Sequence, residues 1–204
     1  MNLPNTLTLA RIFLVPLLVV VLLTRFEAQL IFGVQKEILG AAIFGLAAFT
    51  DWLDGYLARR RRQVTAWGQL MDPLADKLLV TAALVSLVQM GMASAWIVAV
   101  ILGRELGITV LRSVAHARGI AIPASSLGKI KMGAEVVAIL LLILGNQGRG
   151  FFVFGQVALW LVLVTALLSA ANYYSRFSRV LIHSTVADFE SARRRATEKR
   201  VNVG

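Results

Sequence analysis

The sequence predicts an all-α integral membrane protein with six transmembrane helices and both termini in the cytoplasm. Three observations predict this fold class. Of the 204 residues, 58% are hydrophobic, whereas soluble domains are roughly 45–50% apolar. The apolar residues form long runs instead of the alternating pattern of half-buried strands. The basic residues, which produce a net charge of +10, gather between these runs and near the C-terminal end.

Six apolar stretches are each expected to form a membrane-spanning helix, which needs about 20 residues. Their approximate bounds are 7–23, 38–57, 74–90, 95–117, 132–144 and 151–173. The fifth stretch is short, so we expect its helix to extend back through Lys129 and Lys131. Residues 1–183 are then a membrane domain, and residues 184–204 are a polar cytosolic tail.

The charge of the connections predicts the orientation. Four consecutive arginines occupy residues 59–62 between the second and third stretches, and further basic residues flank the fourth connection and fill the tail. Because basic segments stay cytoplasmic, this pattern places both termini inside a multi-pass protein of the inner (plasma) membrane. Aromatic residues do not alternate with the basic ones as in single-strand-binding proteins, so no nucleic-acid partner is expected.

Four aspartates lie in or beside the predicted spans. Asp51 and Asp54 are three residues apart near the end of the second span, and Asp72 and Asp76 are four apart where the third begins. An aspartate at the centre of a span costs about 2.5–3.5 kcal/mol. Each pair occupies one helix face, and a short connection brings both pairs to the cytosolic end. The sequence therefore predicts one active site at the cytosolic ends of the second and third helices.

Clustered carboxylates repel one another unless a cation balances them. Oxygen ligands without histidine or cysteine favour Mg²⁺ or Mn²⁺, and Mg²⁺ usually keeps coordination positions for substrate phosphate. A structural alternative exists for Asp72, which could cap a helix that starts at Pro73. An arginine partner for Asp51 is disfavoured, because arginines are better solvated outside the membrane.

Small and basic residues surround the aspartates. Gly55 and Ala58 would let a bulky group approach the helix backbone, although small residues also serve tight helix packing in membranes. Arg59 could hold a phosphate or could simply anchor the helix in the cytosol.

The whole segment reads Asp51-x2-Asp54-Gly55-x2-Ala58-Arg59-x8-Gly68-x3-Asp72-x3-Asp76. It resembles, at every fixed position, the signature of the CDP-alcohol phosphatidyltransferase family. Members of that family exchange the CMP of a CDP-linked lipid for an alcohol, using divalent metal. The resemblance implies two Mg²⁺ or Mn²⁺ ions, with Asp51, Asp54 and Asp72 as metal ligands. It implies that Asp76 is both a ligand of the second metal and the general base.

The resemblance also implies the residues that bind the CDP-lipid head group. These come from the N-terminal segment and from the signature itself: Asn5, Thr6, Leu7, Thr8, Gly55, Ala58, Arg59, Thr65 and Gly68. A homodimer surrounded by membrane lipids is expected from the resemblance alone.

Softer phrases resemble family members that use sn-glycerol 3-phosphate as acceptor and CDP-diacylglycerol as donor. They are the opening LPNTLTLARI, the phrase MDPLADK, the pair Arg104-Glu105 and the phrase LGKIK, after which Met132 departs from the familiar threonine. Four cations are candidates for the acceptor phosphate: Arg104, Arg112, Lys129 and Lys131. The alternative is a structural ion pair of Arg104 with Glu105 and lysines that extend to the membrane interface.

Three rival functions are open. A family member with another acceptor would make cardiolipin, phosphatidylserine or phosphatidylinositol phosphate, and a panel of acceptors would reveal it. A membrane prenyltransferase also uses aspartate pairs and Mg²⁺, but it does not require the frame of Gly55, Ala58, Arg59 and Gly68. A cation transporter would distribute acidic residues across the membrane depth instead of gathering them at one end.

Overall fold

The computed structural model of the chain describes residues 3–24, 30–31, 34–61, 66–117 and 126–171. Almost all of these residues are helical. The long helices are α1 (Leu3–Leu23), α2 (Lys36–Arg61), α3 (Ala66–Gln89), α4 (Ala95–Ala117), α5 (Ser126–Ile143) and a final helix over Arg149–Ala171. A short 3-10 helix, η1 (Leu144–Gln147), follows α5. Two short strands between α1 and α2, β1 (Leu30–Ile31) and β2 (Val34–Gln35), pair antiparallel.

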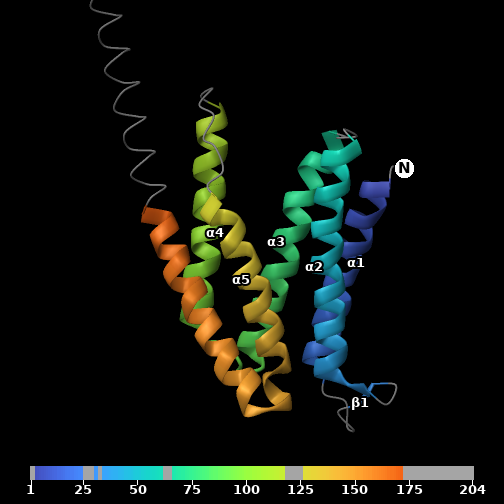
Figure 1. Cartoon of the computed structure of the whole chain (residues 1–204), viewed down its shortest axis with the longest axis vertical. Coiled ribbons are helices and arrows are strands. Elements are labelled where there is room, and N and C mark those ends of the chain that lie inside the picture. Colours follow the sequence, from blue (N-terminus) through green and yellow to red (C-terminus); the bar gives the residue numbers. More distant parts are fainter. Residues whose placement is uncertain (1–2, 25–29, 32–33, 62–65, 118–125, 172–204) are drawn as a thin grey trace, which may run out of the picture.

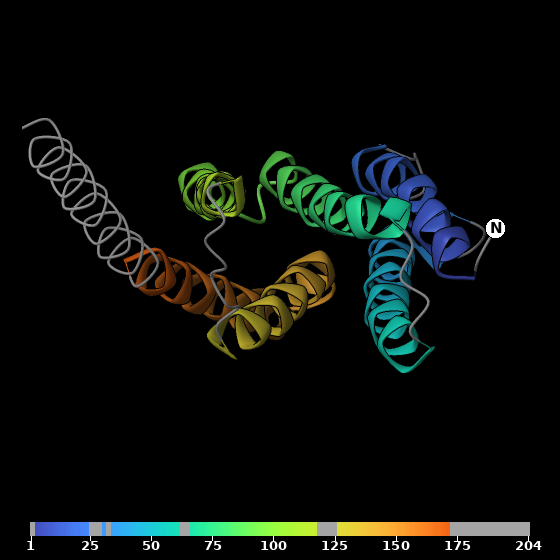
Figure 2. The ribbon, with the colours of Figure 1, turned by 90° about the horizontal axis from the view of Figure 1, so that it is seen from above.

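The helices run alternately in opposite directions (Figure 1). One end of the assembly, uppermost in Figure 1, holds the starts of α1, α3 and α5 and the ends of α2 and α4. Seen from that end in Figure 2, α1, α2 and α3 gather on one side, and α4, α5 and the final helix gather on the other. The described fold is therefore an up-and-down helical assembly whose aspartate-bearing helices, α2 and α3, are contacted by α1.

A glycine turn ends α3 and reverses the chain into α4. Gly91 has a φ of 73°, which a residue with a side chain rarely adopts. The amide of Met92 donates to the carbonyl of Leu87 at 2.9 Å, and that of Gly91 donates to Val88 at 3.0 Å. These bonds form a Schellman motif, which satisfies the last carbonyls of a helix. The turn fixes α4 beside α3.

Leucine, isoleucine and alanine side chains from several helices form one buried core, including Leu18, Leu84 and Ile139. Two glycines allow close helix contacts around it. A Cβ on Gly40 would lie 2.5 Å from Leu22 Cδ2, and one on Gly155 would lie 3.1 Å from the backbone nitrogen of Leu142. The second contact brings the final helix against the backbone of α5.

Among the described helices, one is both long and apolar enough to cross a membrane, the final helix Arg149–Ala171, with a mean hydropathy of 2.3. Shorter apolar helices cover Leu9–Leu23 and Met132–Gln147. Large apolar side chains point outward from several helices, including Phe13 at 71% exposure and Phe154 at 67%. The structure thus confirms that the chain is mainly helical, as the sequence predicts, while the six membrane spans stay a prediction.

Two details of the predicted helices can be compared with the structure. The fifth helix does begin well before Met132, at Ser126, as expected from its short apolar stretch. In contrast, α3 begins at Ala66, so Pro73 is not its first residue. The interpretation of Asp72 as the cap of this helix is therefore wrong, because Asp72 already lies inside it.

Candidate active site

Asp51 of α2 forms an ion pair with Arg11 of α1. The Arg11 Nη1 and Asp51 Oδ1 atoms are 2.8 Å apart. The Arg11 side chain is completely buried, whereas the Asp51 side chain is 29% exposed. The expectation that Asp51 lacks an arginine partner is therefore wrong. The guanidinium needs no solvent here, because the neighbouring helix supplies a carboxylate as its counter-charge.

Asp76 lies on the adjacent helix α3 and is partly buried. Its carboxylate is close enough to interact electrostatically with Asp51, Arg11 and Lys77. One aspartate from each predicted pair thus belongs to the same charged cluster, and the convergence of all four stays a prediction. The cluster lies where α1 contacts both α2 and α3.

The other two aspartates lie on the same helices, one turn away. Asp54 follows Asp51 within α2, and Asp72 precedes Asp76 within α3. Gly55, Ala58 and Arg59 also belong to α2, and Gly68 belongs to the first turn of α3. The described side chains do not include those of Asp54 and Asp72, and within the described set no three acidic or histidine residues converge. The backbone nevertheless carries both pairs on two helices that contact each other.

The donor atoms of this site suit a hard divalent cation. Asp51 and Asp76 supply carboxylate oxygens, which Mg²⁺ and Mn²⁺ prefer. Asp51 retains exposed surface although one oxygen contacts Arg11, so its carboxylate can still reach a bound ion. Asp51 and Asp76 therefore have the chemistry that such an ion requires, and their role as metal ligands stays a prediction.

Lys77 connects the aspartate helix to α4. Its Nζ donates a hydrogen bond to Thr109 Oγ1, and that hydroxyl donates to the carbonyl oxygen of Glu105 at 2.7 Å. The hydroxyl thus accepts one bond and donates another. The ammonium group next to Asp76 is directed at a neighbouring helix, which fixes α3 against α4.

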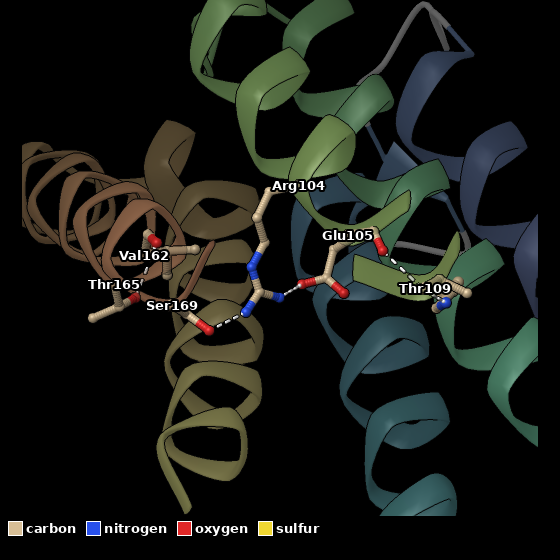
Figure 3. Close-up of polar contacts among 7 residues, drawn as sticks. Arg104, Glu105, Thr109, Val162, Thr165 and Ser169 are labelled. Carbon is tan, nitrogen blue, oxygen red and sulfur yellow. Dashed lines mark hydrogen bonds and ion pairs between the residues drawn. The ribbon is translucent and has the colours of Figure 1, made fainter. Parts of the chain in front are cut away.

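Arg104 lies in a second polar cluster, shown in Figure 3. Its Nη1 is 2.6 Å from Glu105 Oε1, and its Nη2 donates to Ser169 Oγ on the final helix. A partly buried arginine needs such partners in an apolar setting. These contacts favour the structural interpretation of Arg104 over a role in holding the acceptor phosphate.

The remaining predicted site residues cannot be located as side chains. Thr65 lies outside the described residues. For twelve others the structure describes only the helix that carries them, and these are Asn5, Thr6, Leu7, Thr8, Asp54, Gly55, Ala58, Arg59, Gly68, Arg112, Lys129 and Lys131. The same holds for Asp72. Their roles stay predictions.

Comparison with known proteins identifies the family. The family model described as CDP-alcohol phosphatidyltransferase matches residues 1–168. The chain belongs to the CDP-alcohol phosphatidyltransferase family. This is a family of membrane-embedded enzymes that generally depend on a divalent metal.

Curated relatives are similar along most of the chain. The CDP-diacylglycerol–glycerol-3-phosphate 3-phosphatidyltransferase of Bacillus subtilis is 42% identical over 182 residues, which cover 86% of this chain and 94% of the relative. The protein of the same name from Rickettsia typhi is 33% identical and covers 85% of this chain and 95% of its own length. A probable phosphatidylglycerophosphate synthase of Mycobacterium tuberculosis is 38% identical, over 87% of this chain and 82% of the relative.

Sequence reasoning missed Arg11, although it had a usable signal. Arg11 falls inside the first predicted span, residues 7–23, and a cation within a span is a functional hypothesis by default. Its partner could not be read from spacing rules, because those rules relate residues of one helix only. In this member of the CDP-alcohol phosphatidyltransferase family, the buried guanidinium is part of the aspartate cluster.

Proposed function

We propose that the chain transfers the phosphatidyl group of CDP-diacylglycerol to sn-glycerol 3-phosphate, producing phosphatidylglycerophosphate and CMP. The observation that carries this proposal is the similarity to curated enzymes named for that reaction, at up to 42% identity over most of both chains. The aspartate cluster of α2 and α3 supplies the chemistry that a diphosphate substrate requires. The protein is thus an enzyme of phospholipid biosynthesis.

We place the enzyme in the inner (plasma) membrane with all six helices crossing it. The alternating helix directions (Figure 1) support this arrangement. The basic connection after α2 and the basic tail favour a cytoplasmic position for both termini and for the aspartates. Residues 1–183 then form the membrane domain, and residues 184–204 form the cytosolic tail. Two copies of the chain form a homodimer in this proposal.

The mechanism requires neutralisation of the diphosphate before a nucleophile approaches. Divalent cations bound by the carboxylates of Asp51, Asp54, Asp72 and Asp76 would balance that charge and stabilise the departing CMP. The N-terminal residues 5–8, with Gly55, Ala58, Arg59, Thr65 and Gly68, bind the CDP-lipid head group.

Asp76 acts as the general base. An alcohol is a weak nucleophile at neutral pH, and a carboxylate within hydrogen-bond reach accepts its proton as the new bond forms. Asp76 takes the proton of the 1-hydroxyl of sn-glycerol 3-phosphate, and that oxygen attacks the phosphorus that carries diacylglycerol. The bond from this phosphorus to the oxygen shared with CMP breaks, and the electron pair leaves with CMP.

The test of the proposed function is CMP release by the purified protein in detergent. With CDP-diacylglycerol and Mg²⁺, we expect release with sn-glycerol 3-phosphate and not with serine, phosphatidylglycerol or inositol phosphate. Chelation of the metal should reduce the rate to background, because the carboxylates alone repel the diphosphate. Release with one of the other acceptors would replace the proposed substrate but keep the family chemistry. Transfer from a prenyl diphosphate would overturn both.

The acceptor phosphate is held by cations of α4 and α5 in this proposal. Arg112, Lys129 and Lys131 are the principal candidates, with Arg104 behind them because of its contacts with Glu105 and Ser169. Replacement of Lys129 by glutamine should raise the KM for sn-glycerol 3-phosphate about tenfold or more, since a hydrogen bond to a charged group contributes about 1.5–3 kcal/mol.

The KM for CDP-diacylglycerol should stay unchanged in Lys129→Gln, and Arg112→Gln should behave likewise. Lys36→Gln is the matched control, because Lys36 begins α2, and the start of α2 lies at the opposite end of the assembly from the end of α4. An unchanged acceptor KM in both Lys129→Gln and Arg112→Gln would show that this pocket lies elsewhere.

A further inference from the structure

Among the described side chains of the aspartate cluster, that of Arg11 is the most deeply buried. Its side chain has 0% exposure, while its partner Asp51 has 29%. An isolated guanidinium in an apolar interior is costly, and a direct counter-charge offsets that cost. The 2.8 Å contact with Asp51 Oδ1 provides this counter-charge. Asp51 therefore supplies a direct counter-charge to the buried Arg11.

Three helices surround this guanidinium. α1 carries Arg11 and contacts both α2 and α3. From α2, Asp51 faces it directly. From α3, Asp76 interacts electrostatically with Arg11, and also with Lys77 and Asp51. Lys77 Nζ also donates to Thr109 of α4, whereas Arg11 contacts the Asp51 carboxylate directly, at 2.8 Å.

The burial of Arg11 decides which roles are open to it. A fully enclosed guanidinium cannot contact a diphosphate that approaches from solvent or from the lipid interface. Its influence on the reaction must act through the carboxylate that it holds. Arg11 is therefore a positioning residue and not a substrate ligand.

We infer that Arg11 is a built-in counter-cation that assembles the metal site before metal binds: its guanidinium orients Asp51 and offsets part of the aspartate repulsion at the junction of α1, α2 and α3. This inference rests on the proposed role of Asp51 as a metal ligand. Once divalent ions occupy the site they supply the same compensation, so the guanidinium matters most to the metal-free protein. Metal binding and the Arg11 charge are therefore partly interchangeable in stabilising the fold.

The test compares thermal unfolding in detergent with and without excess Mg²⁺. Without Mg²⁺, Arg11→Met should lower the Tm by about 10 °C, as expected when one partner of a buried ion pair is removed. Excess Mg²⁺ should recover most of that loss, so the Mg²⁺-induced rise in Tm should be larger in Arg11→Met than in the wild type. In Arg11→Lys, which keeps the charge, the Mg²⁺-induced rise in Tm should lie between those of Arg11→Met and the wild type.

Arg104→Met is the matched control. It also removes an arginine from an ion pair, that with Glu105 at 2.6 Å, but away from the aspartate cluster. Its Tm should fall as well, while its Mg²⁺-induced rise should equal that of the wild type. This comparison separates loss of a helix contact from loss of a counter-cation.

Each outcome has a distinct meaning. An equal Mg²⁺-induced rise in the wild type, Arg11→Met and Arg104→Met would overturn the inference but leave the metal site intact. Absence of any Mg²⁺ effect on the wild type would contradict the metal-ligand role of Asp51 itself, and the inference with it. Recovery of folded Arg11→Met only in Mg²⁺ would support the inference in its strongest form. Failure to fold even in Mg²⁺ would contradict it, because the metal could not then replace the guanidinium.

Discussion

Replacement of Asp76 by asparagine is expected to lower kcat for CMP release by about 10²–10⁴-fold, the usual contribution of a general base. Asparagine keeps the size of the side chain but cannot accept the proton of the acceptor hydroxyl. The substitution also weakens binding of the second metal ion, for which Asp76 is the proposed ligand, and this lowers kcat further. Because Asp76 is partly buried on α3 beside Asp51 and Arg11, water has limited access to replace it.

The measurement must separate turnover from substrate binding. Initial rates of CMP release give kcat, and equilibrium binding of CDP-diacylglycerol to the same variant in Mg²⁺ tests whether the donor site survives. Retained turnover in Asp76→Asn with intact donor binding would exclude this residue as the base. Glu37→Gln is a suitable control, since Glu37 is a buried carboxylate of the same helical assembly that accepts a hydrogen bond from Asn146 Nδ2 at 2.9 Å. The amide oxygen of the new glutamine can still accept the hydrogen bond from Asn146. The kcat of Glu37→Gln should therefore match that of the wild type.

The helices, and the presence of two aspartates on each of α2 and α3, were predictable because both depend on local periodicity. Apolar runs define helices, and a spacing of three or four residues places side chains on one face. The extension of α5 back to Ser126 follows from the same reasoning, since a short apolar run needs more helix to span a membrane. The start of α3 at Ala66 could not be predicted in this way. Pro73 suggested a later helix start, and the residues before it lack apolar periodicity.

The polar contacts between helices could not be predicted, because each depends on which helices become neighbours. Arg11 and Asp51 meet across α1 and α2, and Arg104 meets Ser169 across α4 and the final helix. For Arg104, the sequence left a phosphate contact and a structural pair equally open. The side-chain geometry in Figure 3, with Glu105 on one side and Ser169 on the other, supplied the missing observation.

Asp51→Asn is expected to be the most damaging single substitution, because it removes a metal ligand and also leaves Arg11 buried beside an uncharged amide. Breaking a buried ion pair from one side costs about 3–5 kcal/mol. Mg²⁺ should not recover this loss, in contrast to Arg11→Met, since no carboxylate is left at this position to bind it. Thermal or denaturant unfolding in detergent measures the change in stability, and CMP release measures the activity.

The double variant Arg11→Met/Asp51→Asn separates the two consequences of that substitution. Apolar methionine removes the buried charge that loses its Asp51 partner in Asp51→Asn, so the double variant should be more stable than Asp51→Asn alone. The double-mutant cycle should return a coupling within the 0.5–3 kcal/mol found for residues in contact. Activity should stay at background in both variants, because neither restores the carboxylate. A double variant as unstable as the sum of the single changes would show that the 2.8 Å contact between Arg11 and Asp51 contributes little to the fold, and any recovery of CMP release would exclude Asp51 as an essential metal ligand.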